Sequence, residues 1–168
     1  ALRMKPASMA KVMTGSIVFD RIKHNSLNML DTFLVSDKAW RMGGSRSFLE
    51  LNSNVSIKDL LLGLIVQSGN DAAVVLAEGI SGDEEAFARE MNSYAKIMGM
   101  TNTYFTNSTG WPHPDLQTSS RDLIILTKKI IEDFLNMIKN EAKITINSLS
   151  DEQKLNFIEN NYLKSKIY

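Results

Sequence analysis

The sequence predicts a mainly α fold, because apolar residues recur at helical spacing while extended segments are few and short. Helical periodicity runs through most of the chain between residues 8 and 134, and glycine and proline lie at its breaks. Only residues 32–36 and 47–51, on either side of Gly43-Gly44, have the pattern of short extended segments. We therefore expect a helical cluster with little sheet.

The expected helices have recognisable starts and stops. The first begins at Ser8, shortly after Pro6, which suits a position just ahead of a helix. Ser56 and Asp59 have the spacing of a capping box, and Ser119 and Asp122 repeat it further along. After the first helix, the expected helical segments are 60–66, 71–78, 83–98 and 119–134.

Composition excludes several classes of protein without giving a function. Of the 168 residues, 43% are hydrophobic and 23% are charged, which is typical of a globular domain. Nineteen basic and nineteen acidic residues balance, so no overall charge points to nucleic acid. There is no cysteine, and no apolar run approaches the ~20 residues of a membrane span. The chain opens at Ala1 without an initiator Met, so an export signal or anchor ahead of it would not be visible.

The composition changes after Phe134. Residues 135–168 hold six Asn, five Lys and five Ile, but no Gly, Pro, Val, Arg or Trp. We therefore divide the chain into residues 1–134, the helical part, and a divergent tail, 135–168. The tail is compatible with a pair of polar surface helices or with partial disorder.

Ser8 and Lys11 form a candidate nucleophile and base. A serine attacks poorly until a neighbouring group takes its proton, and a lysine three residues later on a helix lies on the same face. The positive end of the helix dipole would disfavour the protonated lysine, which helps it act as a base. The spacing alone is weak support, because Ser93 and Lys96 share it within a helix that carries core-facing Tyr94.

The wider pattern around this pair resembles a known family, the low-molecular-mass penicillin-binding proteins, which are serine D,D-carboxypeptidases. The segment Pro6-Ala7-Ser8-Met9-Ala10-Lys11-Val12-Met13-Thr14 resembles the family's first active-site box. The segment Gln67-Ser68-Gly69-Asn70-Asp71-Ala72-Ala73 resembles its second box, Ser-Gly-Asn. Together with similar runs at 38–49, 91–95 and 119–123, the resemblance covers roughly residues 3–134 in the right order.

The resemblance implies roles for four residues. Ser8 would attack the penultimate D-Ala carbonyl of a peptidoglycan pentapeptide and form an acyl-enzyme, with Lys11 accepting the proton. Ser68 would relay a proton to the departing D-Ala, and Asn70 would bind the substrate amide. No cofactor or metal is expected, β-lactams are expected covalent inhibitors, and the location is expected to be periplasmic or otherwise extracytoplasmic. From the residues alone, Ser68 and Asn70 could equally cap the helix that begins at Asp71.

The family's third box, Lys-Thr-Gly on a strand that binds the substrate carboxylate, is absent. All nine glycines lie at or before Gly110, and none has Lys or His two positions ahead. The family fold is α+β, like the β-lactamases, and we expect its helical part here with most of the antiparallel sheet missing. One apolar side of the helical cluster would then be uncovered. We expect a truncated chain with impaired turnover.

Two other functions stay open. A non-catalytic helical remnant or binding module would also keep two boxes and lack the third. A class A β-lactamase is a third hypothesis, but such enzymes usually have Asp where this chain has Gly69. His24 and His113 each have an aspartate nearby but no third ligand in sequence reach, so we expect both on the surface and no metal site.

Overall fold

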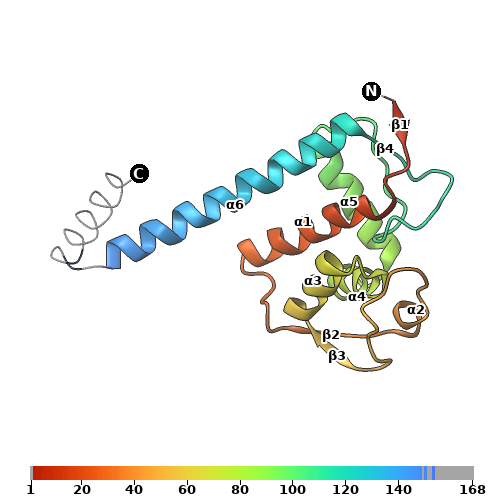
Figure 1. The fold of residues 1–168 in the computed structure, drawn as a ribbon, viewed down its shortest axis with the longest axis horizontal. Helices are drawn as coiled ribbons and strands as arrows, with labels where there is room; N and C mark the ends of the chain where they lie inside the picture. The colour runs from red at the N-terminus through yellow and green to blue at the C-terminus, as the bar shows by residue number, and fades with distance from the viewer. Residues whose placement is uncertain (1, 149, 151–152, 154–168) are drawn as a thin grey trace, which may run out of the picture. The chain divides into compact units, whose positions relative to one another are not determined.

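The computed structural model of this chain describes residues 2–148, 150 and 153. Two compact units meet between Thr127 and Lys128, within the long helix α6, Ser120–Ser148. The first unit holds, in chain order, β1 Arg3–Met4, the 3-10 helix η1 Ala7–Met9, α1 Ala10–Lys23, β2 Thr32–Leu34, α2 Asp37–Trp40, β3 Asn54–Ser56, α3 Ile57–Val66, α4 Asn70–Ser81, α5 Glu84–Ile97 and β4 Thr118–Ser119 (Figure 1). The predicted mainly α fold is confirmed.

The helix α4 is the centre of the first unit. It packs against α1, α2, α3, α5 and β2, and residues 70–77 are all buried. Alanine and valine dominate this stretch, and their small side chains let the neighbouring helices approach closely. The central helix in turn fixes the position of the segment that precedes it, residues 67–69.

The serine of each predicted capping box caps its helix. Ser56 precedes α3, and its hydroxyl accepts a hydrogen bond from the Asp59 backbone N–H at 3.1 Å. Ser119 does the same before α6, accepting from the Asp122 N–H at 3.2 Å. Each cap satisfies a backbone donor that the first turn of a helix leaves free.

The sheets are two separate antiparallel pairs. β2 pairs with β3, with Phe33 opposite Val55, and β1 pairs with β4, with Arg3 opposite Ser119. The predicted extended segment at 32–36 therefore contains a strand. The β1–β4 pair, which the sequence did not indicate, joins the start of the chain to the start of α6.

The predicted strand at 47–51 is wrong. These residues form a loop, and Phe48 has φ 56°, in the left-handed region that a strand residue does not adopt. The partner of β2 is β3, Asn54–Ser56, a few residues later. Apolar and β-favouring side chains gave this segment its strand-like pattern, but the backbone is held by a buried carboxylate, described below.

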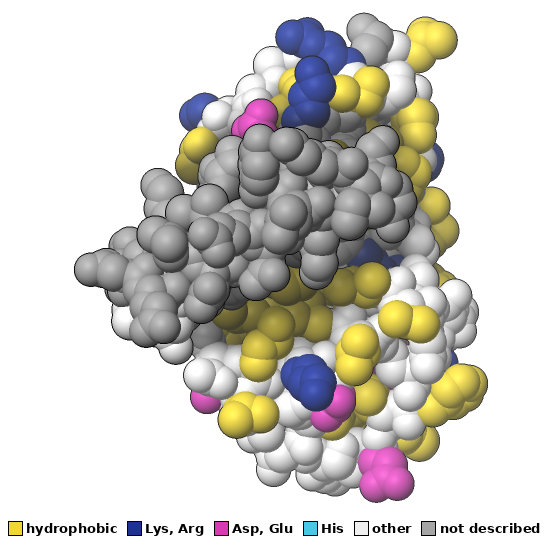
Figure 2. Space-filling model, turned by 60° about the vertical axis from the view of Figure 1, so that its left-hand side comes forward, with side chains coloured by type: hydrophobic (Ala, Val, Ile, Leu, Met, Phe, Trp, Pro, Cys, Tyr) yellow, Lys and Arg dark blue, Asp and Glu magenta, His cyan; other side chains and the backbone are white. Residues whose placement is uncertain are grey.

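Apolar side chains are exposed on both α1 and α3. In α1, Val12 is 40% exposed and Phe19 44%, and in α3, Ile65 is 62% exposed and Val66 75%. Figure 2 shows a face of the molecule on which hydrophobic side chains are numerous among scattered charged ones. Among the described residues, no helix combines the length and the hydrophobicity that crossing a membrane would require.

The boundary predicted after Phe134 stays a prediction. α6 continues through that residue to Ser148. Residues 149, 151–152 and 154–168, which make up much of the predicted tail, lie outside the described residues.

Candidate active site

Ser8 lies in the single 3-10 turn, η1, that leads into α1. Its side chain is exposed, whereas the next turn of the chain, from Ala10, enters the core. The residue before it, Ala7, has φ 49°. A non-glycine residue in this region costs roughly 1–2 kcal/mol, and such strain is concentrated at functional sites. The local backbone therefore presents the Ser8 hydroxyl at the surface at a conformational cost.

Lys11 lies beneath Ser8 and is 5% exposed. Its Nζ lies 3.3 Å from the Ser8 Oγ and donates to the Thr109 carbonyl at 2.9 Å. Burial lowers the pKa of Lys11 to about 8, because the ammonium loses water that the neutral amine needs less. Within the described residues Lys11 forms no ion pair, so no carboxylate opposes this effect. A measurable share of Lys11 is therefore neutral, and able to accept a proton, near pH 7.

The loop that supplies the Thr109 carbonyl is held by Asn107. The Asn107 Oδ1 accepts from the Gly110 N–H at 2.8 Å, the Trp111 N–H at 3.0 Å and the Thr109 hydroxyl at 3.1 Å. Gly110 has φ 81°, and a Cβ built on it would lie 1.8 Å from the Ala7 carbonyl oxygen. The loop thus contacts the backbone beside the nucleophile, and this position requires glycine.

The second candidate box lies between α3 and α4. Ser68 is half-buried and has φ 55°, another non-glycine residue in the left-handed region. Asn70 is 7% exposed, and its Nδ2 donates to the Gly43 carbonyl at 2.8 Å while its backbone N–H donates to the Ser45 carbonyl at 2.8 Å. Both ends of Asn70 are therefore tied to the loop at 43–45, which fixes the orientation of its carboxamide.

The 168 residues match one family over nearly their whole length. The D-alanyl-D-alanine carboxypeptidases, peptidase family S11, match residues 1–167. This chain belongs to that family. The match reaches into the tail, beyond the run of motifs that ends near residue 134.

Individual carboxypeptidases show the same relationship. The chain is 39% identical over 130 residues to D-alanyl-D-alanine carboxypeptidase DacF of Bacillus subtilis, covering 77% of the chain and 33% of that protein. It is 37% identical over 157 residues to DacA of Haemophilus influenzae, covering 90% of the chain and 40% of that protein. The chain spans about a third to two fifths of the length of these relatives.

Solved structures agree with the fold. A crystal structure of penicillin binding protein 5 from Haemophilus influenzae matches with a TM-score of 0.76 and 40% identity, over 79% of this chain and 39% of that one. The D-alanyl-D-alanine carboxypeptidase DacD of Francisella tularensis matches with a TM-score of 0.76 and 38% identity, over 77% of this chain and 32% of that one. The chain therefore has the helical part of the penicillin-binding-protein fold, as predicted.

A buried aspartate, to which the sequence analysis gave no role, holds the segment around the second candidate box. Asp71 is 1% exposed, and its carboxylate accepts from the Ser47 N–H at 2.8 and 3.0 Å, the Ala72 N–H at 2.9 Å and the Leu49 N–H at 3.3 Å. These bonds connect the residue after Asn70 to the segment mistaken for a strand. The sequence feature that could have indicated this role is Asp71 itself, because it is the only acidic residue of the second box.

The four predicted site residues are only partly linked by direct contacts. Ser8 and Lys11 are in direct contact. Asn70 is the first residue of α4, which packs against α1, and Ser68 lies two residues before it; the approach of both to Ser8 stays a prediction. The other serine–lysine pair of matching spacing is part of a helix, α5, where the Ser93 hydroxyl donates to the Arg89 carbonyl at 3.0 Å.

Neither histidine belongs to this site. His24 and His113 are exposed, as predicted, and their nearest carboxylates are those of Asp20, at 3.5 Å, and Asp115, at 3.8 Å. Across the described residues, no group of three or more His, Cys, Asp or Glu side chains is placed to hold a metal ion.

Proposed function

We propose that Ser8 and Lys11 carry out acyl transfer on peptides ending in D-Ala-D-Ala, as in a serine carboxypeptidase. The observation that supports this most directly is the contact between a buried lysine of lowered pKa and an exposed serine, with Nζ and Oγ 3.3 Å apart. Such distances are often slightly long without substrate and shorten when it binds. Family membership supplies the substrate class.

In the proposed reaction, the Ser8 Oγ attacks the carbonyl carbon of the penultimate D-Ala while its proton passes to the neutral Lys11 amine. The negative charge that develops on the carbonyl oxygen needs hydrogen-bond donors, of which the Ser8 backbone N–H is the one this segment supplies. The carbon–nitrogen bond then breaks, the leaving D-Ala amine takes a proton, and water later hydrolyses the acyl-enzyme. The Thr109 carbonyl keeps the lysine amine oriented throughout.

We further propose that Ser68 relays the proton to the leaving amine and that Asn70 binds the substrate amide. The positive φ of Ser68 and the fixed carboxamide of Asn70 support these roles, because both indicate a segment held in one conformation. A β-lactam would acylate Ser8 in the same way. By family, the site would act on peptidoglycan outside the cytoplasm, in the periplasm or its equivalent.

The pH dependence of acylation tests this proposal. We expect the rate at which a labelled penicillin acylates the chain to rise about tenfold per pH unit up to about pH 8 and then level, because Lys11 must be neutral to accept the proton. The measurement is the fluorescence of protein-bound penicillin at timed intervals. Ser8→Ala should abolish the label, and Ser93→Ala, in the other pair of the same spacing, should leave it unchanged. Labelling that survives Ser8→Ala would contradict the proposal by showing that another residue is acylated, and a parent chain that takes no label would favour a non-catalytic binding module.

We also propose that these 168 residues alone release D-Ala from a peptide slowly, even where a penicillin acylates Ser8. The sequence contains no Lys-Thr-Gly, so a second oxyanion donor and a partner for the substrate carboxylate are not supplied by a known motif. Loss of one oxyanion donor costs about 10²–10³ in rate. Release of D-Ala from a peptide by the purified chain should therefore be at least ~10²-fold below that of an intact relative. Equal rates, abolished by Ser8→Ala, would show that the third box is dispensable.

A further inference from the structure

A proline-containing segment, residues 111–116, forms a strap beside the turn that carries Ser8. It follows directly on the loop whose Thr109 carbonyl binds Lys11, and only Gly110 separates that carbonyl from the strap. Pro112 and Pro114 have no backbone N–H, which leaves the strap few donors with which to fix itself. Its start is tied to Asn107, and the residue after its end, Gln117, pairs with Tyr104.

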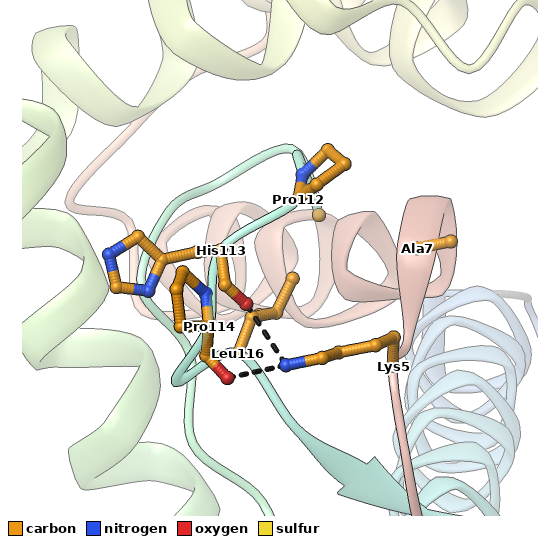
Figure 3. A pocket seen from close by; sticks show the side chains of 7 residues that line it. Lys5, Ala7, Pro112, His113, Pro114 and Leu116 are labelled. Atoms are coloured by element: carbon orange, nitrogen blue, oxygen red, sulfur yellow. Dashed lines mark hydrogen bonds between the residues drawn. The ribbon is translucent and has the colours of Figure 1, made fainter.

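Lys5 binds the middle of this strap. Its Nζ donates to the His113 carbonyl at 3.0 Å and to the Pro114 carbonyl at 2.5 Å (Figure 3). Lys5 can reach these oxygens because it follows β1 directly, and β1 is paired with β4, just beyond the strap. Charge-assisted hydrogen bonds of this kind are shorter and stronger than neutral ones.

Part of the strap borders open space. A cavity of about 400 Å³ lies between Lys5 and Ala7 on one side and Pro112, His113 and Pro114 on the other. In Figure 3 the Lys5 side chain extends to the carbonyl side of the strap, and the dashed lines mark its two hydrogen bonds. Since empty space borders the strap, a chain without these bonds has room to move it.

We infer that Lys5 is a positioning residue for Lys11: it holds the strap so that the Thr109 carbonyl stays over the lysine amine and water stays out. The effect of Lys5 on acylation rests on the proposed function, whereas its effect on the burial of Lys11 does not. The path runs from the Lys5 amine to the carbonyls of residues 113 and 114, along the backbone to Thr109, and from the Thr109 carbonyl to Lys11. If the strap moves, Lys11 gains water and loses part of the burial that favours its neutral form.

The test measures the titration of Lys11 directly. In the full chain, the reactivity of the Lys11 amine toward an acylating amine reagent is followed against pH by peptide mass spectrometry. Lys5→Met removes the donors but keeps the length of the side chain. We expect the midpoint for Lys11 to rise from about 8 by about one pH unit toward its ordinary value, and the penicillin acylation rate at pH 7 to fall about tenfold.

Two matched variants distinguish positioning from a general loss of structure. Lys5→Arg restores donors and should keep the Lys11 midpoint within about 0.3 pH unit, and the acylation rate within about twofold, of the parent. Lys58→Met replaces an exposed lysine in the first turn of α3 and should change neither. A Lys11 midpoint that is the same in Lys5→Met and parent would overturn the inference, as would a Lys5→Arg chain that shifts as far as Lys5→Met. A shift in the midpoint with no penicillin reaction in any chain would support the Lys5 inference and reject the proposed function.

Discussion

Replacing Lys11 with Met is expected to slow acylation of Ser8 by about 10²–10⁴-fold, the range that loss of a general base produces. The Met side chain fits the buried site but cannot accept the serine proton, which then has no acceptor at 3.3 Å. The residual rate should lose the rise with pH that the parent shows below about 8. The measurement is the time course of labelled-penicillin binding at several pH values.

The same variant should not lose stability near pH 7. The folded-state pKa of Lys11 lies below its ordinary value, so the unfolded chain binds the proton more tightly between about pH 8 and 10.5. The free energy of unfolding of the parent therefore rises as pH rises through this window. Below the window, Lys11 is charged in both states, and burying that charge destabilises the folded parent.

Lys96→Met, in the other serine–lysine pair, should match the parent in acylation. Acylation by Lys11→Met within threefold of the parent would count against Lys11 as the base.

Replacing Asp71 with Ala is expected to lower the free energy of unfolding by about 2–4 kcal/mol. The carboxylate accepts from the backbone N–H groups of Ser47, Leu49 and Ala72, and its loss leaves these donors without their acceptor. The left-handed Phe48 between two of them would also lose the contact that holds it. Urea unfolding of parent and variant, compared at equal slope, gives the difference.

A surface aspartate provides the control for this measurement. The Asp115 side chain is 75% exposed, and Asp115→Ala should change stability by no more than about 0.5 kcal/mol. Asp71→Asn keeps the volume but can accept with only one oxygen, so it should fall between parent and Asp71→Ala. A stability for Asp71→Ala equal to that of Asp115→Ala would mean that the 47–49 loop is held by other contacts.

Local signals in the sequence predicted the helices and the nucleophile pair. The Ser56–Asp59 and Ser119–Asp122 caps act between near neighbours, so residue spacing was sufficient to place both helix starts. Ser8 and Lys11 are likewise one helical turn apart, and the structure brings their side chains into contact. These features depend on backbone geometry within a few residues, and the spacing of residues in the sequence is enough to predict such geometry.

Contacts between distant segments could not be predicted from the sequence. The Thr109 carbonyl is 98 positions from Lys11, and Lys5 meets its acceptors 108 and 109 positions away. A backbone carbonyl has no sequence signature, because every residue carries one. The strand expected at 47–51 failed for the same reason, since a carboxylate from the second box determines the backbone there. The motifs therefore predict the nucleophile pair, whereas the contacts that hold Lys11 and the 47–49 loop depend on tertiary structure.

The position of the covalent bond tests the proposed role of Ser8 most directly. The purified chain is treated with a penicillin at pH 8, digested, and the peptides are sequenced by mass spectrometry. We expect one adduct per chain, on the peptide that contains Ser8 and on the Ser8 oxygen, with none on the peptide that contains Ser93. An adduct on any other residue, or a chain that forms none while an intact relative is fully labelled under the same conditions, would contradict the assignment of Ser8 as the nucleophile.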